Sequence, residues 1–357
     1  MFRILKISSA FIGIIVGAGF ASGQEILQYF TSFGYWGIAG ALFSAILFAY
    51  LGMMLTRIGC QLQADSHKEA IYFIGGKRGG LLIDAILVFT FFGVGVVMVA
   101  GAGSTLNQQF GLPPFVGSLI LIILIILSLL LKIDKVIGVI GSITPFLLLA
   151  IVVVSIYSIG TMESSFQEMD AVTAELPDYF SNWFIGAVNY ASFNIAVGAG
   201  MSFVMGGAEK NVRIASIGGF VGGLGIGVMM LLAHLAIFSK VDVVASSELP
   251  ILKIFEEISP ILSIAMSFVL FGMIFNTGLS MFYGFIARFV DVEDKQKNYR
   301  FIVMTCVVGF VFSFIGFKVL VDKLYTLIGF AGLLLILALI IAPIRLKKDK
   351  LNKDKAA

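Results

Sequence analysis

The chain has 357 residues, of which 59% are hydrophobic and 13% are charged, and its mean hydropathy is +1.04. Soluble globular domains carry about 25% charged residues, so this composition excludes a soluble fold and indicates an integral membrane protein. Two cysteines and two histidines are too few for a disulfide framework or a multi-ligand metal site, and we expect no cofactor and no nucleic-acid partner.

Apolar stretches long enough to cross a bilayer follow one another along the chain. Because a spanning helix needs about 20 apolar residues, the sequence predicts an all-α fold with ten transmembrane helices, over residues 7–30, 35–56, 81–106, 114–132, 136–160, 183–206, 213–239, 259–288, 300–317 and 321–344. We expect the first stretch to be a true span, since a short uncharged turn leads from it into the next. Residues 247–260 predict an outward helical segment, either a lid or an ordinary loop helix.

The basic residues indicate an orientation. With ten spans, 20 of the 24 lysines and arginines fall on one side of the membrane, which predicts a multi-pass protein of the cell membrane with both termini in the cytoplasm. No basic residue remains for the middle of the membrane, so we expect a binding site there to disfavour dianionic solutes.

Two sequence repeats divide the chain into halves. The tetrapeptide VGAG occurs at 16–19 and 197–200, and IDKVIGVIGSITPFLLLA from Ile133 resembles VDKLYTLIGFAGLLLILA from Val321. Five helices per half force the second copy to enter the membrane from the opposite side, which makes the repeat inverted. We therefore expect a first five-helix repeat, an acidic extracellular loop, a second repeat and a basic cytoplasmic tail, over residues 1–160, 161–182, 183–345 and 346–357.

Glycine weakens a helix, and corresponding glycine-interrupted helices are typical of transporter binding sites. The repeat thus predicts that helices one and six are interrupted, with N–H groups near Gly19 free for a carboxylate and carbonyls near Gly198 free for an ammonium group. The alternative is close helix packing by the same glycines. The candidate solute-binding residues are Gly17, Ala18, Gly19, Phe20, Ala21, Ser22, Phe193, Asn194, Ala196, Val197, Gly198, Ala199 and Gly200.

Three motifs resemble a known family. Five plus five helices with two breaks, together with GIIVGAGF and SFNIAVGAG, resemble the LeuT fold of the amino acid-polyamine-organocation transporter superfamily, and GIIVGAGFASGQEI is similar to bacterial YkvI-type membrane proteins. The resemblance implies a cation-coupled secondary transporter of a small amino acid or related zwitterionic or amine solute. The chain lacks the two extra C-terminal helices of some members. Nothing indicates an enzyme or an oligomeric state, whereas a channel or a transporter-derived sensor stays possible.

The resemblance also implies a sodium site between helix one and helix eight. The matching positions are the carbonyls of Gly13 and Val16 and the polar side chains of Asn276, Thr277 and Ser280. The alternative is that these hydroxyls bond back to their own helix.

Coupling to protons through Glu25 is the rival to sodium. Glu25 is the one acidic residue that we cannot assign to a loop or interface, and it predicts an outer gate, a protonation site or a partner for a cationic solute, unless it is solvated in an outer vestibule. We expect Asp84 to be a charge at a helix N-terminus and His234 to be a hydrogen-bonded packing residue.

Overall fold

The computed structural model describes residues 1–130, 144–290 and 294–356, and its regular elements are helices. Six helices are long and apolar enough to cross a membrane: Trp36–Leu62, His67–Phe110, Trp183–Gly207, Val212–Phe238, Pro260–Ile286 and Phe317–Leu346. Three shorter apolar helices accompany them, over Pro114–Leu130, Pro145–Gly160 and Asn298–Ser313. The repeat segment at Asp134, Lys135 and Gly141 lies outside the described residues, so the ten-span count and the domain limits stay predictions.

The first predicted span consists of three short helices, α1 (Phe2–Ile15), α2 (Ala18–Ser22) and α3 (Gln24–Tyr29), followed by the turn η1 (Thr31–Phe33). The other predicted spans correspond to α4 (Trp36–Leu62), α5 (His67–Phe110), α6 (Pro114–Leu130), α8 (Thr144–Gly160), α10 (Trp183–Gly207), α11 (Val212–Phe238), α14 (Pro260–Ile286), α15 (Lys295–Ser313) and the run α16 (Phe317–Leu320), η2 (Val321–Tyr325) and α17 (Thr326–Ala356). Loop helices are α9 (Phe166–Thr173), α12 (Val241–Val244) and α13 (Pro250–Ile258).

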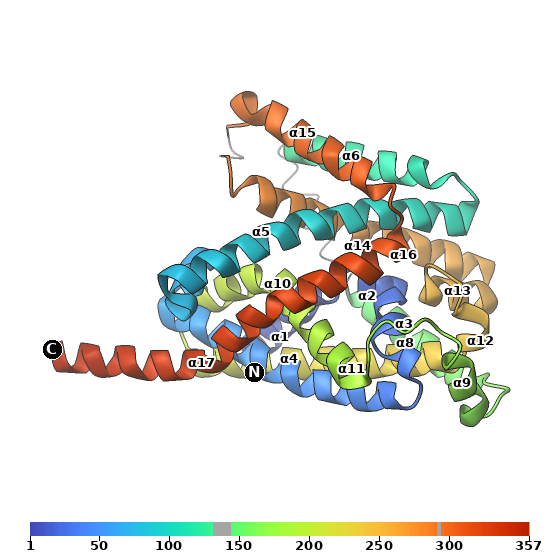
Figure 1. The fold of residues 1–357 in the computed structure, drawn as a ribbon, viewed down its shortest axis with the longest axis horizontal. Coiled ribbons are helices and arrows are strands. Elements are labelled where there is room, and N and C mark those ends of the chain that lie inside the picture. Colours follow the sequence, from blue (N-terminus) through green and yellow to red (C-terminus); the bar gives the residue numbers. More distant parts are fainter. Residues whose placement is uncertain (131–143, 291–293, 357) are drawn as a thin grey trace.

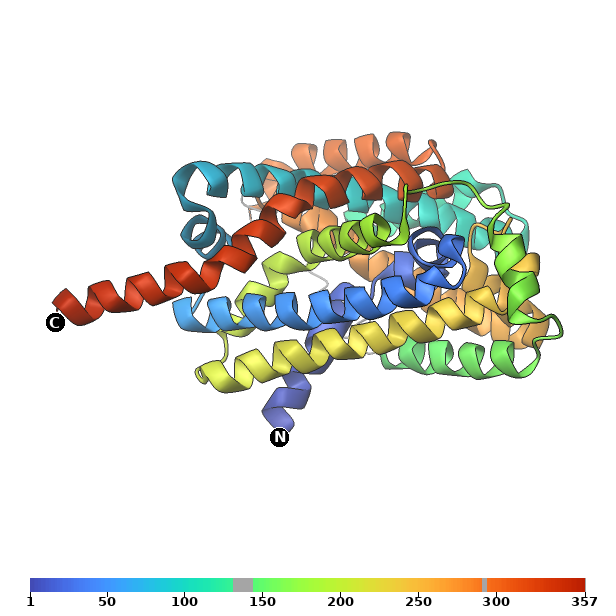
Figure 2. The ribbon, with the colours of Figure 1, turned by 60° about the horizontal axis from the view of Figure 1, so that its bottom comes forward.

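The helices form an elongated bundle (Figures 1 and 2). α4 packs along α11 and α10, and α5 packs along α14 and α6. α9, α12 and α13 gather at the end of the bundle opposite the C-terminus, so the segments predicted to be extracellular share one end. The predicted outward segment therefore contains a real helix, α13, which lies over the first span.

Glycines set the distance between α4 and α11. A Cβ atom on Gly219 would lie 2.2 Å from the Gly52 carbonyl oxygen, and one on Gly223 would lie 2.2 Å from the Phe48 carbonyl oxygen. Only glycine lets two helix backbones approach this closely, which is the usual way to pack helices where lipid removes the hydrophobic driving force.

The first span is broken where the sequence places its first VGAG. Val16 has φ −75° and ψ 84°, Gly17 is extended, and α2 begins at Ala18. A second turn follows at Gly23, whose φ of 83° lies in the left-handed region that favours glycine. α13 covers this turn, because a Cβ on Gly23 would lie 3.0 Å from the backbone nitrogen of Ile251.

The predicted interruption of the sixth span is wrong. α10 runs without a break from Trp183 to Gly207, and the Gly198 carbonyl also accepts a hydrogen bond of 2.7 Å from Ser202 Oγ. The glycine serves packing instead, since a Cβ on Gly198 would lie 2.4 Å from Ile15 Cδ1 at the end of α1. The alternative of close helix packing is therefore the correct one for this residue.

Candidate functional site

The break in the first span leaves backbone oxygens without their helical donors. The Gly17 N–H donates to the Ile15 carbonyl at 2.8 Å instead of to Gly13. Within the described residues the Val16 carbonyl likewise accepts no bond from the Phe20 N–H. The carbonyls of Gly13 and Val16 are the two that the sequence assigned to an ion, and they are available for one.

Helix α14 passes directly beside this break. A Cβ on Gly17 would lie 3.6 Å from Thr277 Oγ1, so the predicted partners in helices one and eight are brought together. Thr277, Ser280 and Asn276 are half-buried, and their side chains make no hydrogen bond within the described part of the chain. The predicted alternative, bonding of these hydroxyls back to their own helix, is therefore wrong, whereas Ser267 of α14 does bond to the Ile264 carbonyl at 2.7 Å.

Glu25 lies over the second glycine of the motif. The turn at Gly23 redirects the chain, and a Cβ on Gly19 would lie 1.7 Å from Glu25 Oε1 and 2.7 Å from its Cδ. The side chain is 4% exposed, which excludes a solvated position in an open vestibule. The Tyr190 side chain lies beside this carboxylate, and Asn194 Nδ2 donates to the Tyr190 backbone carbonyl at 3.1 Å.

The helix that carries Glu25 is buried on every side. All six residues of α3 are buried, although four of them, Gln24, Glu25, Gln28 and Tyr29, carry polar groups. Gln24 Nε2 and Oε1, Gln28 Oε1 and Tyr29 Oη are buried atoms without a partner in the described structure. Gln28 Nε2 donates at 3.4 Å to the Asp322 carbonyl and to Thr326 Oγ1, which ties α3 to the last span.

Aromatic rings and a further amide complete this region. The rings of Tyr29 and Tyr190 have centroids 5.2 Å apart, and those of Phe193 and Tyr325 stack at 4.0 Å. Tyr325 ends η2, a π-helical turn of the kind often found at functional sites. Asn189 Nδ2 donates to the Thr326 carbonyl at 3.1 Å, while Asn189 Oδ1 is another buried atom left without a partner.

Some of the predicted solute-binding residues therefore lie close together in the structure, and others do not. Gly17, Gly19, Phe193 and Asn194 lie at the region just described, and Phe20 and Ala21 are buried beside them. Ser22 Oγ is used within its own turn, where it donates to the Gly19 carbonyl at 2.7 Å. Ala196, Val197, Ala199 and Gly200 are ordinary residues of the continuous α10 helix, so the predicted free carbonyls for an ammonium group are absent there.

The sequence prediction missed Gln24, Gln28, Tyr29, Asn189, Tyr190 and Tyr325. The signal that could have found the first three is the fragment GQEILQY, which places four polar residues within seven positions of a membrane-spanning segment. Polar groups buried in lipid-surrounded helices are costly and mark solute or ion pathways.

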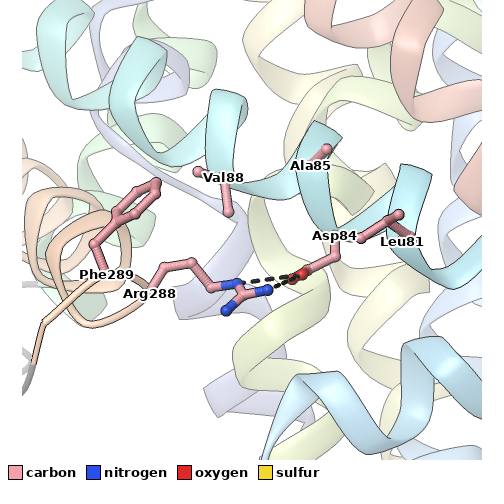
Figure 3. Close-up of a pocket in the computed structure, with 6 residues that line it drawn as sticks. All are labelled: Leu81, Asp84, Ala85, Val88, Arg288 and Phe289. Atoms are coloured by element: carbon pink, nitrogen blue, oxygen red, sulfur yellow. Dashed lines mark hydrogen bonds and ion pairs between the residues drawn. The ribbon is translucent and has the colours of Figure 1, made fainter.

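A buried ion pair between Asp84 of α5 and Arg288 lies apart from the region around Glu25. Asp84 is 2% exposed and accepts bonds from Arg288, including one of 3.2 Å from Nε, beside a cavity lined by Leu81, Ala85, Val88 and Phe289 (Figure 3). The prediction that Asp84 lies at a helix N-terminus is wrong, because it lies eight residues beyond Gly76, whose φ of 67° and ψ of −174° divide α5 into two helical parts. His234 matches its prediction, with Nδ1 3.1 Å from Thr31 Oγ1.

In the broken first span α1 packs against α11 and α10, and α2 packs against α14. Comparison with solved structures shows that the chain has the LeuT fold. MhsT in complex with L-phenylalanine matches with a TM-score of 0.64 and 18% identity over 96% of each chain. A mutant manganese transporter of Eremococcus coleocola matches at 0.58 with 16% identity, covering 96% of this chain and 78% of that one. Mhp1 in its inward-facing conformation also matches at 0.58, with 12% identity over 92% and 73% of the two chains.

Sequence comparison identifies relatives of nearly the same length. No family profile matches the chain. It is 26% identical to the uncharacterized membrane protein YkvI of Bacillus subtilis over 94% of each chain, and 24% identical to the uncharacterized protein YyaD of the same organism over 93% and 95%. The expected resemblance to YkvI-type multi-pass membrane proteins is confirmed. The Eremococcus coleocola neighbour is a transporter and not an enzyme, in agreement with the prediction for this chain.

Proposed function

We propose that the chain is a secondary active transporter of a small amino acid or a related zwitterionic or amine solute, coupled to sodium and working by alternating access. The observation that carries this proposal is the break at Val16 and Gly17, where two backbone carbonyls and the nearby Thr277 hydroxyl lack partners among the residues that the structure describes. Oxygen ligands suit a hard monovalent cation, and an interrupted membrane helix needs its freed carbonyls satisfied.

An organic solute fits the site better than a transition metal does. One structural neighbour is a manganese transporter and another was solved with L-phenylalanine. Among the residues that the structure describes, no three His, Cys, Asp or Glu side chains cluster as metal ligands. Buried amides, phenols and a single carboxylate instead favour a solute that hydrogen-bonds and carries positive charge.

Uptake into proteoliposomes tests the proposal and its ion. We expect saturable accumulation of a radiolabelled amino acid or amine with external sodium at fixed pH, lost when choline replaces sodium. Thr277→Ala should raise the sodium concentration for half-maximal uptake by about 10- to 100-fold, the effect of removing one ligand of a charged group. Ser267→Ala is the matched control, because that hydroxyl already bonds within α14.

Four outcomes would contradict this proposal. Uptake indifferent to sodium but driven by a pH gradient would make the proton the coupling ion. Flux without saturation would indicate a channel, and binding without flux would indicate a sensor. Equal sodium dependence in the Thr277→Ala variant and the control would remove the ion from this position.

A further inference from the structure

The burial of Glu25 poses a question of charge. Its side chain is 4% exposed, and no lysine, arginine or histidine pairs with it among the side chains that the structure describes. The Tyr190 side chain lies beside it but brings no positive charge. A buried carboxylate is costly without a counter-charge, so either a proton or a bound cation must neutralise it.

The surroundings of Glu25 distinguish these two solutions. A proton would neutralise the carboxylate and leave the nearby amide oxygens as they are. An ammonium group has three donors, so besides Glu25 it could also bond to the Gln28 side-chain oxygen, which lies one helical turn further along α3 and is buried without a partner among the described residues. This second acceptor favours the ammonium group.

The aromatic residues support the same choice. Tyr29, Tyr190 and Tyr325 are each at most 1% exposed, and all three lie within electrostatic range of the Glu25 carboxylate. Aromatic faces attract organic cations through their quadrupoles, and cages of such rings are a recurrent way to bind ammonium groups. Neutral solutes or anions gain nothing from this arrangement.

The position of Glu25 also indicates whether the solute carries a carboxylate beside its amine. The carboxylate lies against Gly19, where the sequence placed the carboxylate of an amino acid. Two carboxylates at one place repel each other, and the described part of the chain offers no basic side chain there. A solute with an amine and no adjacent carboxylate avoids this repulsion.

We propose that Glu25 binds the ammonium group of the solute, in a site that α3 shares with α10 and η2, and that the preferred solute is an amine without an α-carboxylate. This inference rests on the proposed transport function and makes its solute class specific. It replaces the carbonyls of α10, which the continuous helix keeps occupied, as the ammonium acceptor.

Pairs of amino acids and their decarboxylated amines test the inference. Equilibrium binding to the purified protein is measured for L-phenylalanine against 2-phenylethylamine and for L-leucine against 3-methylbutylamine, with sodium present. Each amine should bind at least tenfold more tightly than its parent amino acid. Glu25→Gln should weaken amine binding on the order of 100-fold, as removal of one partner of a buried charge pair does.

Two further variants separate charge from fold. Glu25→Asp keeps the negative charge and should retain amine binding weakened by about tenfold, even if Glu25→Gln disturbs folding. Asp322→Asn is the matched control, because Asp322 lies on the neighbouring η2 element but already pairs with Lys323 at 2.9 Å. It should leave amine affinity within about twofold of the parent.

The results separate this inference from the proposed function. Tighter binding of the amino acids, failure of either amine to bind, or amine binding unchanged in Glu25→Gln would overturn the inference. A loss of only pH-driven uptake in Glu25→Gln, with amine affinity intact, would assign a proton to Glu25 instead. Amine binding that depends on Glu25 without any flux would uphold the inference and contradict transport.

Discussion

Gly19 offers a direct test of how Glu25 is positioned. In Gly19→Ala the new Cβ would lie 1.7 Å from Glu25 Oε1, whereas nonbonded heavy atoms settle near 3.5 Å. The carboxylate would have to move by roughly 1.8 Å, and overpacking of this kind costs about 1–3 kcal/mol. Since 1.4 kcal/mol is a factor of ten, we expect solute affinity to fall by about 5- to 150-fold.

A double-mutant cycle locates the cause of this loss. Glu25→Ala removes the atoms that the new methyl group would meet, so adding Gly19→Ala in that background should leave thermal stability unchanged. The coupling between the two positions, measured by thermal unfolding of the purified protein, should then equal the 1–3 kcal/mol of the single change, within about 0.5 kcal/mol. Additive effects of the two substitutions would refute the contact.

Gly17→Ala is the matched control in the same motif. Gly17 has φ −92° and ψ −169°, which alanine can adopt, and its Cβ would meet Thr277 Oγ1 at an ordinary 3.6 Å. We therefore expect solute affinity within about threefold of the parent, since substitutions that disturb no packing or backbone geometry usually change the free energy by no more than about 0.5 kcal/mol. A loss equal to that of Gly19→Ala would mean that the break itself, rather than Glu25, demands both glycines.

Two other predictions concern packing and charge. Gly198→Ala should lower the free energy of unfolding by about 1–3 kcal/mol, because its Cβ would lie 2.4 Å from Ile15 Cδ1. Adding Ile15→Val removes that Cδ1 atom and should restore the free energy of unfolding. Equal stability of all variants in thermal unfolding would argue against this contact. Arg288→Gln leaves buried Asp84 with only the more distant His67, whose Nε2 is 3.9 Å from Asp84 Oδ1 in the described chain, and should cost about 2 kcal/mol, less than the 3–5 kcal/mol of a fully buried pair because the Arg288 side chain is 34% exposed. Asp84→Asn should recover most of that loss, and a double variant no more stable than Arg288→Gln would show that the pair is not its cause.

Composition and hydropathy were sufficient for the class of fold. Apolar stretches of spanning length depend only on local sequence, and the structure contains helices at all ten, although part of the fifth lies outside the described residues. The motif around Gly17 also indicated the region of the first break, because glycine at the end of a helix acts through the local backbone.

The second VGAG shows where such local reasoning ends. The same four letters are non-helical at 16–17 and helical at 197–200, where Gly198 packs against Ile15 of α1 and its carbonyl also accepts a bond from Ser202 one turn further along α10. The sequence prediction missed the polar residues of α3 for a similar reason. Only the left-handed turn at Gly23 brings Glu25 back over Gly19, and no periodicity in the sequence records that fold-back.

Glu25 and Asp84, two of the three buried carboxylates of the described chain, illustrate how the protein distributes charge. Asp84 has a permanent partner in Arg288, so its charge is compensated in every state that keeps this pair. Glu25 has none from the described chain, and its charged form is stable only when water or a cation reaches it. On the proposed transport function, the empty protein with an ionised Glu25 is expected to favour states in which water reaches this carboxylate. Binding of a cationic solute would remove that requirement, which would couple occupancy of the site to the hydration of Glu25.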